Sequence, residues 1–211
     1  MMRITEPAAG IYKIEVPFET LYTSVFAVRV GEGYVLIDSA TTADDVDGVI
    51  LPALREIGLA GAPQALLLTH GHSDHAGGAA RLGERFPGLP VCALEPIDAA
   101  NYRALADGEV VGERLQVVHL PGHTRFSVGY LDLPTGTLLA GDCLQQQVVG
   151  KYTNGVGDPV RYLASIARLR GMGLRRILAS HDYVPLGCLA EGSAAIAAYL
   201  AECERPWAGQ R

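Results

Sequence analysis

Apolar and polar residues alternate over most of the first forty positions, a pattern typical of β-strands that bury one face. The alternation predicts three successive strands, and a Gly-Glu-Gly turn stands before the third. The expected strands are residues 10–16, 23–30 and 33–37. The chain is therefore expected to open with a β-meander.

Apolar residues then recur at helical spacing, alternating with short apolar runs that indicate strands. In the first half the predicted helices are residues 42–57, 75–86 and 96–105, and the predicted strands are 65–68 and 89–93. In the second half the predicted strands are 113–120, 127–133, 137–140 and 176–179, and the predicted helices are 158–170 and 189–202. Asp158-Pro159 is a strong helix start, with Asp as the N-cap and Pro at the first helical position.

Both halves combine several strands with strand–helix alternation, which indicates an α/β sandwich with sheets inside and helices outside. The length of 211 residues is enough to bury a large core. No linker-like stretch separates the halves, so one domain spanning residues 1–211 is expected.

Composition and charge exclude several classes of protein. Hydrophobic residues make up 49% of the chain and charged residues 19%, as in an ordinary soluble globular protein. The net charge of −6 repels phosphate backbones and anionic membranes, so neither nucleic acid nor a membrane is expected as a partner. The four cysteines lie far apart, and no signal peptide or apolar run of roughly 18 residues is present, which favours a cytoplasmic protein.

The densest chemical feature is the segment His70-Gly71-His72-Ser73-Asp74-His75, between a predicted strand and a predicted helix. His70 and His72 are two residues apart on extended chain and point to the same side, while Asp74 and His75 lie where the helix begins. Burying three imidazoles and a carboxylate in an apolar core would cost free energy unless all of them found hydrogen-bond partners. We therefore interpret the loop as metal-binding. The donor types suit zinc, iron or manganese, and no cysteine cluster indicates a closed structural zinc site.

Three further residues of ligand type follow predicted strands: His123, Asp142 and His181. The carboxyl ends of strands in helix-flanked sheets form the usual binding crevice, so these residues are expected to converge there. His119 lies within a predicted strand, and we expect it to be an ordinary sheet histidine rather than a ligand.

The order of these motifs resembles that of the metallo-β-lactamase superfamily over nearly the whole chain. The resemblance implies an αββα sandwich of two mixed β-sheets flanked by helices. The matching motifs are VLID at 35–38, HGHSDH at 70–75, PGHT at 121–124, GD at 141–142 and SHDY at 180–183.

The same resemblance implies a centre of two divalent metal ions, with zinc as the first choice and iron or manganese as alternatives. Asp38 is implied to orient the histidine loop from behind the metal ligands. The implied ligands are His70, His72 and His123 for one ion, Asp74, His75 and His181 for the other, and Asp142 as the bridge.

The chain differs from several branches of the superfamily, each in a different feature. True β-lactamases lack the bridging carboxylate, and flavodiiron enzymes carry Glu at the place of His72. Acyl-homoserine lactonases have a Tyr shortly after the bridge, where this chain reads Cys143-Leu144-Gln145. RNase Z-like phosphodiesterases have an RNA-binding arm that is absent here, and the acidic charge does not suit RNA.

Locally the chain is most similar to glyoxalase II, a thioesterase. Gly150-Lys151 and His181-Asp182-Tyr183 stand where that family has Gly-Lys and His-Glu-Tyr. Glyoxalase II adds a C-terminal helical domain with basic glutathione contacts, whereas thirty residues follow His181 here, which argues against glutathione thioesters. Lys151, Tyr152 and Tyr183 are the expected substrate contacts.

The implied site predicts hydrolysis of a thioester or ester in a small substrate. Two cations sharing a water lower its pKa from about 15.7 to about 7, and the bridging hydroxide attacks a carbonyl. Asp74, a ligand with a second oxygen, is the expected catalytic residue that orients the nucleophile or carries its proton. A mononuclear iron persulfide dioxygenase using His70, His123 and Asp142, a lactonase and a non-catalytic binding module are the alternatives, and the residues leave a homo-oligomer open.

Overall fold

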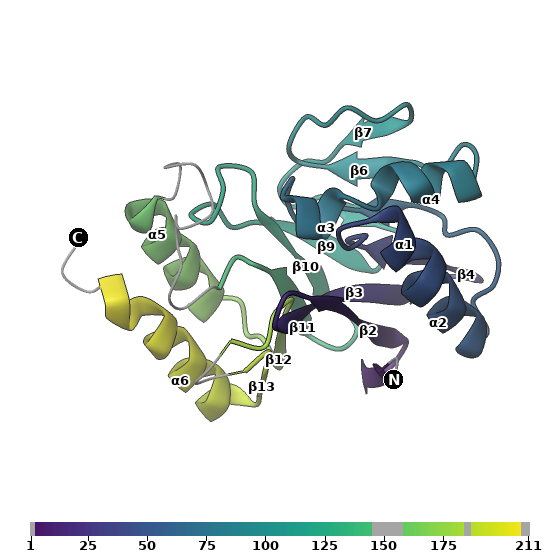
Figure 1. Cartoon of the computed structure of the whole chain (residues 1–211). Helices are drawn as coiled ribbons and strands as arrows, with labels where there is room; N and C mark the ends of the chain where they lie inside the picture. Colours follow the sequence, from purple (N-terminus) through teal and green to yellow (C-terminus); the bar gives the residue numbers. More distant parts are fainter. Residues whose placement is uncertain (1–2, 145–157, 184–186, 208–211) are drawn as a thin grey trace. The chain divides into compact units, whose positions relative to one another are not determined.

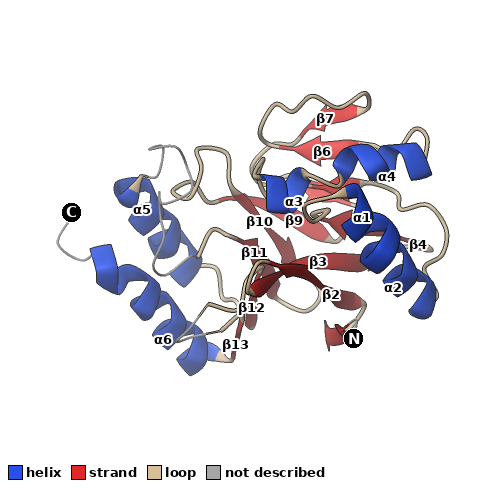
Figure 2. Ribbon diagram, in the orientation of Figure 1, coloured by secondary structure: helices blue, strands red, loops and turns tan. Residues whose placement is uncertain are grey.

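The computed structural model describes residues 3–144, 158–183 and 187–207. The polypeptide divides into two units, residues 1–105 and residues 106–211 (Figure 1). Each unit contains one mixed β-sheet and a set of helices that packs on that sheet (Figure 2). The two mixed sheets with flanking helices confirm the predicted fold class, and a single functional domain over both units stays a prediction.

The sheet of the first unit, in the order β1-β2-β3-β4-β5-β6-β7, is antiparallel at one end and parallel at the other. Its antiparallel meander is β1 (Arg3–Ala8), β2 (Ile11–Phe18), β3 (Leu21–Val30) and β4 (Gly33–Ile37). The parallel strands beside β4 are β5 (Leu66–Leu67), β6 (Val91–Ala93) and β7 (Tyr102–Ala104). The predicted meander is confirmed, with β1 as an additional edge strand.

The helices of the first unit cover one face of its sheet, where Val46, Ile50, Leu54 and Leu82 join a buried apolar cluster with strand residues. The predicted helix 42–57 is present as three consecutive helical segments, the middle one a π-helix. It begins at Thr42, whose side chain accepts a hydrogen bond from the Asp45 backbone N–H in a capping box. The three segments are α1 (Ala43–Asp45), η1 (Val46–Ile50) and α2 (Leu51–Glu56). Where one helix was predicted over 75–86, the structure has two, α3 (Ser73–Ala76) and α4 (Ala79–Arg85), separated by Gly77 and Gly78.

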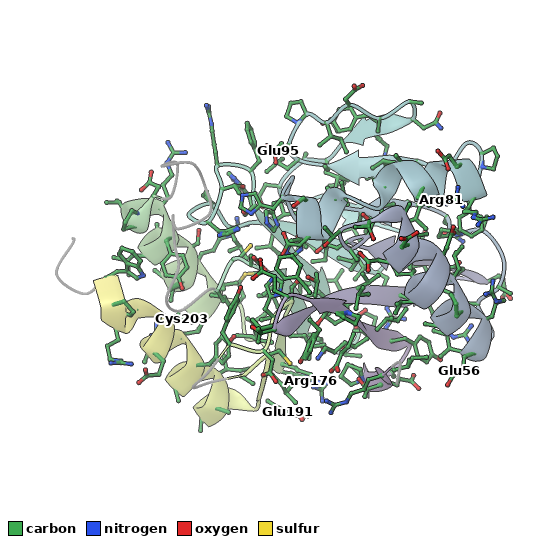
Figure 3. The ribbon with its side chains drawn as sticks, in the orientation of Figure 1. Glu56, Arg81, Glu95, Arg176, Glu191 and Cys203 are labelled. Carbon is green, nitrogen blue, oxygen red and sulfur yellow. The ribbon has the colours of Figure 1, made fainter. Side chains whose placement is uncertain are left out.

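The sheet of the second unit, in the order β13-β12-β11-β10-β9-β8, has one parallel pair, β11 with β12, among antiparallel neighbours. Arg176 and Glu191 form an ion pair across β12 and β13 (Figure 3). The strands are β8 (Val110–Val111), β9 (Leu115–His119), β10 (Val128–Asp132), β11 (Thr137–Gly141), β12 (Arg176–Ala179) and β13 (Leu189–Glu191).

Helices α5 (Pro159–Arg170) and α6 (Ser193–Glu204) pack on this second sheet through buried residues such as Tyr162, Ile166 and Leu200. A 3-10 turn, η2 (Arg205–Trp207), follows α6. The predicted N-cap is confirmed, because the Asp158 side chain accepts from the Arg161 backbone N–H at 3.0 Å. In the part of the chain that the structure describes, no helix has the length and apolarity needed to cross a membrane.

Two predicted helices are corrected by the structure. Residues 96–105 form β7 and irregular chain instead of a helix, because residues 102–104 pair in parallel with β6 and the Leu105 N–H donates to the Ala93 carbonyl. The last helix begins at Ser193 rather than at 189, because 189–191 pair with β12 and Gly192 has a φ of 81°. In both places, pairing with a neighbouring strand overrides the local helical pattern.

Candidate metal centre

In the first unit the candidate ligands follow the carboxyl ends of parallel strands. Asp38 comes directly after β4, and His70 lies three residues after β5, which runs parallel to β4. Glu95 lies two residues after β6, the next parallel strand. Parallel strands end at one edge of a sheet, so this topology gathers the three segments.

Helix α3 then places the rest of the histidine motif. His72 is its N-cap residue, and Asp74 and His75 lie in its first turn. The ring centroid of His70 is 4.5 Å from that of His72 and 4.2 Å from that of His75. Asp74 Oδ2 lies 3.4 Å from His75 Nε2. The four residues of the motif are therefore brought together.

Asp38 fixes the orientation of His75 from within the core. Its carboxylate is fully buried and accepts hydrogen bonds from the Thr69 backbone N–H at 2.8 Å and from the Thr69 hydroxyl at 2.8 Å. His75 Nδ1 lies 2.7 Å from Asp38 Oδ2, and because a carboxylate only accepts, Nδ1 carries the proton. Nε2 is then the atom of His75 that can ligate a cation. Asp38 adopts a φ of 62°, a strained backbone conformation of the kind found at functional sites.

Two residues that hold the loop, Thr69 and Glu95, were missed by the sequence analysis. The Thr69 hydroxyl donates to Asp38 and lies 3.1 Å from His70 Nδ1, so it accepts from that nitrogen and leaves Nε2 for a metal. Glu95 accepts from the Gly71 backbone N–H at 3.0 Å, and a Cβ at position 71 would lie 2.7 Å from that carboxylate oxygen (Figure 3). Glycine between the two histidines is the one signal in the sequence that a group approaches this backbone closely.

Two glycines after α3, Gly77 and Gly78, allow this helix to pack closely against the chain that follows β4. The Ser39 backbone N–H donates to the His75 carbonyl at 2.7 Å. A Cβ on Gly77 would lie 2.0 Å from the Thr41 carbonyl oxygen, and one on Gly78 would lie 2.1 Å from the Ser39 carbonyl oxygen. Larger residues at these positions would push α3 and its ligands out of place.

In the second unit three single ligands reach the same edge of their sheet. Strands β9, β11 and β12 run in one direction, because β10 is antiparallel to both β9 and β11, and β12 is parallel to β11. His123 lies four residues after β9, Asp142 directly after β11, and His181 two residues after β12. All three side chains are buried.

Asp142 lies between His123 and His181, the two candidate histidine ligands of its unit. Its Oδ1 is 3.3 Å from His181 Nε2, and its Oδ2 is 3.6 Å from His123 Nε2. Each carboxylate oxygen therefore faces a different imidazole. The His181 ring also lies 5.2 Å from the ring of Tyr183.

These separations fit ligands that share a cation. Ligand atoms about 2.0–2.1 Å from a tetrahedral ion lie about 3.3–3.4 Å from one another. The measured separations are 3.4 Å for Asp74 and His75, 3.3 Å for Asp142 and His181, and 3.6 Å for Asp142 and His123. The imidazole nitrogens and carboxylate oxygens are the donors that zinc, iron and manganese accept. The residues of both units thus offer donor types and separations that suit ligation of a metal ion.

The other expectations have different outcomes. His119 ends β9, its Nε2 donates to the Arg125 carbonyl at 2.9 Å, and it belongs to neither group of candidate metal ligands in the described residues, which agrees with its interpretation as a sheet histidine. Tyr183 is half-buried beside His181. Lys151 and Tyr152 lie outside the described residues.

Comparison with known proteins agrees with this arrangement. A model of the metallo-beta-lactamase superfamily matches residues 19–181. The chain belongs to the metallo-beta-lactamase superfamily. Solved structures share its fold: a metallo-beta-lactamase of Erythrobacter litoralis aligns with a TM-score of 0.74 and 22% identity over 97% of this chain and 96% of that one. The protein TTHA1623, solved in a di-iron-bound form, aligns with a TM-score of 0.68 and 29% identity over 84% of this chain and 93% of that one.

Curated relatives within the superfamily carry the name hydroxyacylglutathione hydrolase, the thioesterase also called glyoxalase II. The protein of Xylella fastidiosa strain M23 is 37% identical over 143 residues, which are 64% of this chain and 53% of the relative. That of Yersinia enterocolitica is 36% identical over 128 residues, covering 57% and 49% of the two chains. The chain therefore spans about half the length of the curated relatives it matches.

Proposed function

We propose that this member of the superfamily is a dinuclear metal-dependent hydrolase that cleaves a thioester or ester bond in a small substrate. The observation that carries the proposal is the Asp142 carboxylate, whose two oxygens face His181 and His123 at 3.3 and 3.6 Å. A carboxylate that offers one oxygen to each of two imidazole ligands is arranged to bridge two cations. The proposal assigns His70, His72 and His123 to one ion, Asp74, His75 and His181 to the other, and Asp142 to both.

Two divalent ions bound there would supply Lewis acidity, which activates water near neutral pH and polarises a carbonyl. Asp38 and Thr69 hold the Nδ1 atoms of His75 and His70 as donors, which leaves both Nε2 atoms unprotonated and able to ligate a cation. Asp74 has a second carboxylate oxygen besides the one 3.4 Å from His75 Nε2, and we assign it the task of holding the proton that water gives up. Burial of His70, His75, His123 and His181 excludes bulk water from the ligands.

The thioester class is supported by the names of the curated relatives, hydroxyacylglutathione hydrolases. A small substrate is supported by the net charge of −6, which disfavours polynucleotides.

We propose zinc as the metal, because nitrogen and oxygen ligands at tetrahedral separations suit it, with iron or manganese as alternatives. We further propose a cytoplasmic location, which is supported by the four cysteines of the described residues, none of which forms a disulfide there. Tyr183, beside His181, is the proposed substrate contact in the described chain.

The test is a hydrolysis screen on metal-loaded protein whose metal content is measured on the same sample. The panel contains small thioesters, esters, lactones and phosphodiesters, and oxygen uptake is followed with a persulfide. We expect two ions per chain and thioesters or esters as the fastest substrates. Faster cleavage of phosphodiesters, or one iron per chain with oxygen uptake on a persulfide, would contradict the proposal. Asp142→Ala serves as the inactive control.

A further inference from the structure

A polar cavity of about 310 Å³ opens in the second unit beside the turn that carries His123. Gly122 and Thr124, the neighbours of His123 in the chain, form part of its wall. Arg125, Asp158 and Arg161 also line it among the residues that the structure describes. The cavity is thus built on the same short turn as a proposed metal ligand.

Side-chain hydrogen bonds hold that turn in one conformation. The Thr124 backbone N–H donates to Ser127 Oγ at 3.0 Å, and the hydroxyls of Thr124 and Ser127 are 2.8 Å apart. His119 Nε2 donates to the Arg125 carbonyl at 2.9 Å, and Arg168 donates to the His119 carbonyl at 2.9 Å. The backbone at Arg125 is therefore held in place by hydrogen bonds.

The turn is also locked to the start of α5. Gly122 has a φ of 145°, and a Cβ there would lie 2.6 Å from Tyr162 Cα. The Asp158 backbone N–H donates to the Gly122 carbonyl at 3.0 Å. This contact places Arg161, in the first turn of α5, on the wall of the same cavity as Arg125.

The described part of the cavity wall is cationic although the chain is acidic. Among the described lining residues, two guanidinium groups and one carboxylate leave a single net positive charge, whereas the chain carries −6. Arg161 Nε is 3.2 Å from Asp158 Oδ2, and both side chains are largely exposed. Arg125 is exposed and lies over the Phe126 ring at 5.4 Å, and no acidic side chain among residues 3–144, 158–183 and 187–207 forms an ion pair with it. A guanidinium presents a planar fork of donors, and that of Arg125 is exposed at the cavity.

We propose that this cavity, with Arg125 as its main contact and Arg161 as its second, is a subsite for a carboxylate group on the substrate. The inference rests on the proposed function, because it places an anionic end of the cleaved molecule beside the turn of His123. A guanidinium binds a carboxylate through two parallel hydrogen bonds, which suits a planar carboxylate at the end of a short chain. Arg125 would then determine specificity and would take no part in the bond cleavage itself.

The test compares two thioesters that differ only at one end, a carboxylate in one and its neutral primary amide in the other. For the carboxylate substrate Arg125→Ala is expected to raise KM about tenfold and to leave kcat within about twofold, since uniform binding is lost. For the amide substrate neither constant should change. Arg161→Ala should act in the same direction, and Arg125→Lys should keep part of the preference. Arg205→Ala is the matched control, because Arg205 is an exposed arginine of the same unit that pairs with Glu202 outside the cavity.

A binding measurement separates this inference from the proposed function. The uncleavable thioether analogue of the carboxylate substrate is titrated calorimetrically into metal-loaded wild-type, Arg125→Ala and Arg205→Ala proteins. About tenfold weaker binding to Arg125→Ala alone supports the subsite even if no thioester is cleaved. Equal binding to all three proteins overturns the subsite, and the proposed function then stands or falls on the hydrolysis screen.

Discussion

The two units assemble their candidate ligands by different routes. In the first unit His70, His72, Asp74 and His75 come from six consecutive positions at a strand–helix junction. In the second, His123, Asp142 and His181 follow three different strands and meet because those strands run in the same direction. The first set depends on local chain geometry, whereas the second depends on the topology and register of an entire sheet.

The supporting contacts differ in the same way. In the first unit Asp38 and Thr69 hold two imidazole rings from the core, and Glu95 holds the backbone between His70 and His72. In the second unit the Asp142 carboxylate itself is the common partner of both histidines. The first set is therefore fixed by residues behind the ligands, and the second by one of the ligands, so single substitutions should affect the two units differently.

The largest effect is expected for Asp142→Ala. Removing the carboxylate takes away the partner of both His123 and His181, so we predict loss of both metal ions and a fall in kcat of at least about a thousandfold. Metal content by elemental analysis and kcat on the best thioester of the screen are the measurements.

His119→Ala is the control for that experiment, because His119 belongs to neither group of candidate ligands in the described chain. Its metal content should equal that of the wild type. A variant Asp142→Ala that still holds two ions would show that the carboxylate is not the bridge.

Metal removal should have the next largest effect, on the free energy of unfolding. Without cations, Asp74 and Asp142 stay close to imidazoles in largely buried surroundings, where polar groups are costly to desolvate. Binding to the folded state alone contributes about 4 kcal/mol when the free metal is a thousandfold above its dissociation constant. Thermal unfolding before and after verified chelation measures it, and an unchanged melting temperature would contradict the prediction.

What the sequence could predict follows the same division between local and long-range geometry. The meander, the strands that precede each ligand and the Asp158 cap are encoded by neighbouring residues, and all were predicted. The helix expected at 96–105 was wrong, because pairing of 102–104 with β6 decides that segment and pairing cannot be read from local periodicity. Thr69 and Glu95 were missed for a related reason, because each acts on a residue that is distant in the sequence. Thr69 contacts Asp38, and Glu95 contacts Gly71.

Gly122→Ala tests how far the ligands of the second unit depend on close backbone packing. The new Cβ would lie 2.6 Å from Tyr162 Cα, and the φ of 145° is unfavourable for alanine. We predict destabilisation of about 3 kcal/mol, measured by denaturant unfolding. Gly83→Ala is the matched control in the first unit, because at that helical position no atom lies within 4 Å of the new Cβ. Its free energy of unfolding should rise by about 0.5–1 kcal/mol. Equal stability of the two variants would contradict the close-packing argument.

Asp38→Asn tests the support behind the first set of ligands. Asparagine tolerates the φ of 62° and keeps an acceptor, but it loses the negative charge that faces His75 Nδ1 at 2.7 Å. We predict metal affinity lowered about 10- to 100-fold, the usual cost of losing a partner behind a metal ligand. Competition with a chelator measures it. Asp182→Asn, at an exposed carboxylate beside His181 in the sequence, is the control, and an equal loss there would contradict a specific role for Asp38.

The smallest effect concerns an ion-pair cluster that joins η1 to α4 in the first unit. Asp47 accepts from Arg81 Nε at 3.0 Å and from Arg85 Nε at 2.9 Å, and hydrogen bonds from Arg85 and Arg81 hold the pKa of its carboxyl well below the usual range. Because the pKa of Asp47 is lower in the folded state than in the unfolded state, its ionised carboxyl stabilises the fold at pH values above the unfolded pKa of about 4. This stabilisation is lost as the pH falls towards the folded pKa. Because these side chains are partly exposed, we predict that Asp47→Asn lowers the melting temperature at pH 7 by only about 1–2 °C. Circular dichroism should show this difference shrinking below pH 4, whereas a constant difference from pH 7 to pH 2 would place its origin outside the titration of Asp47.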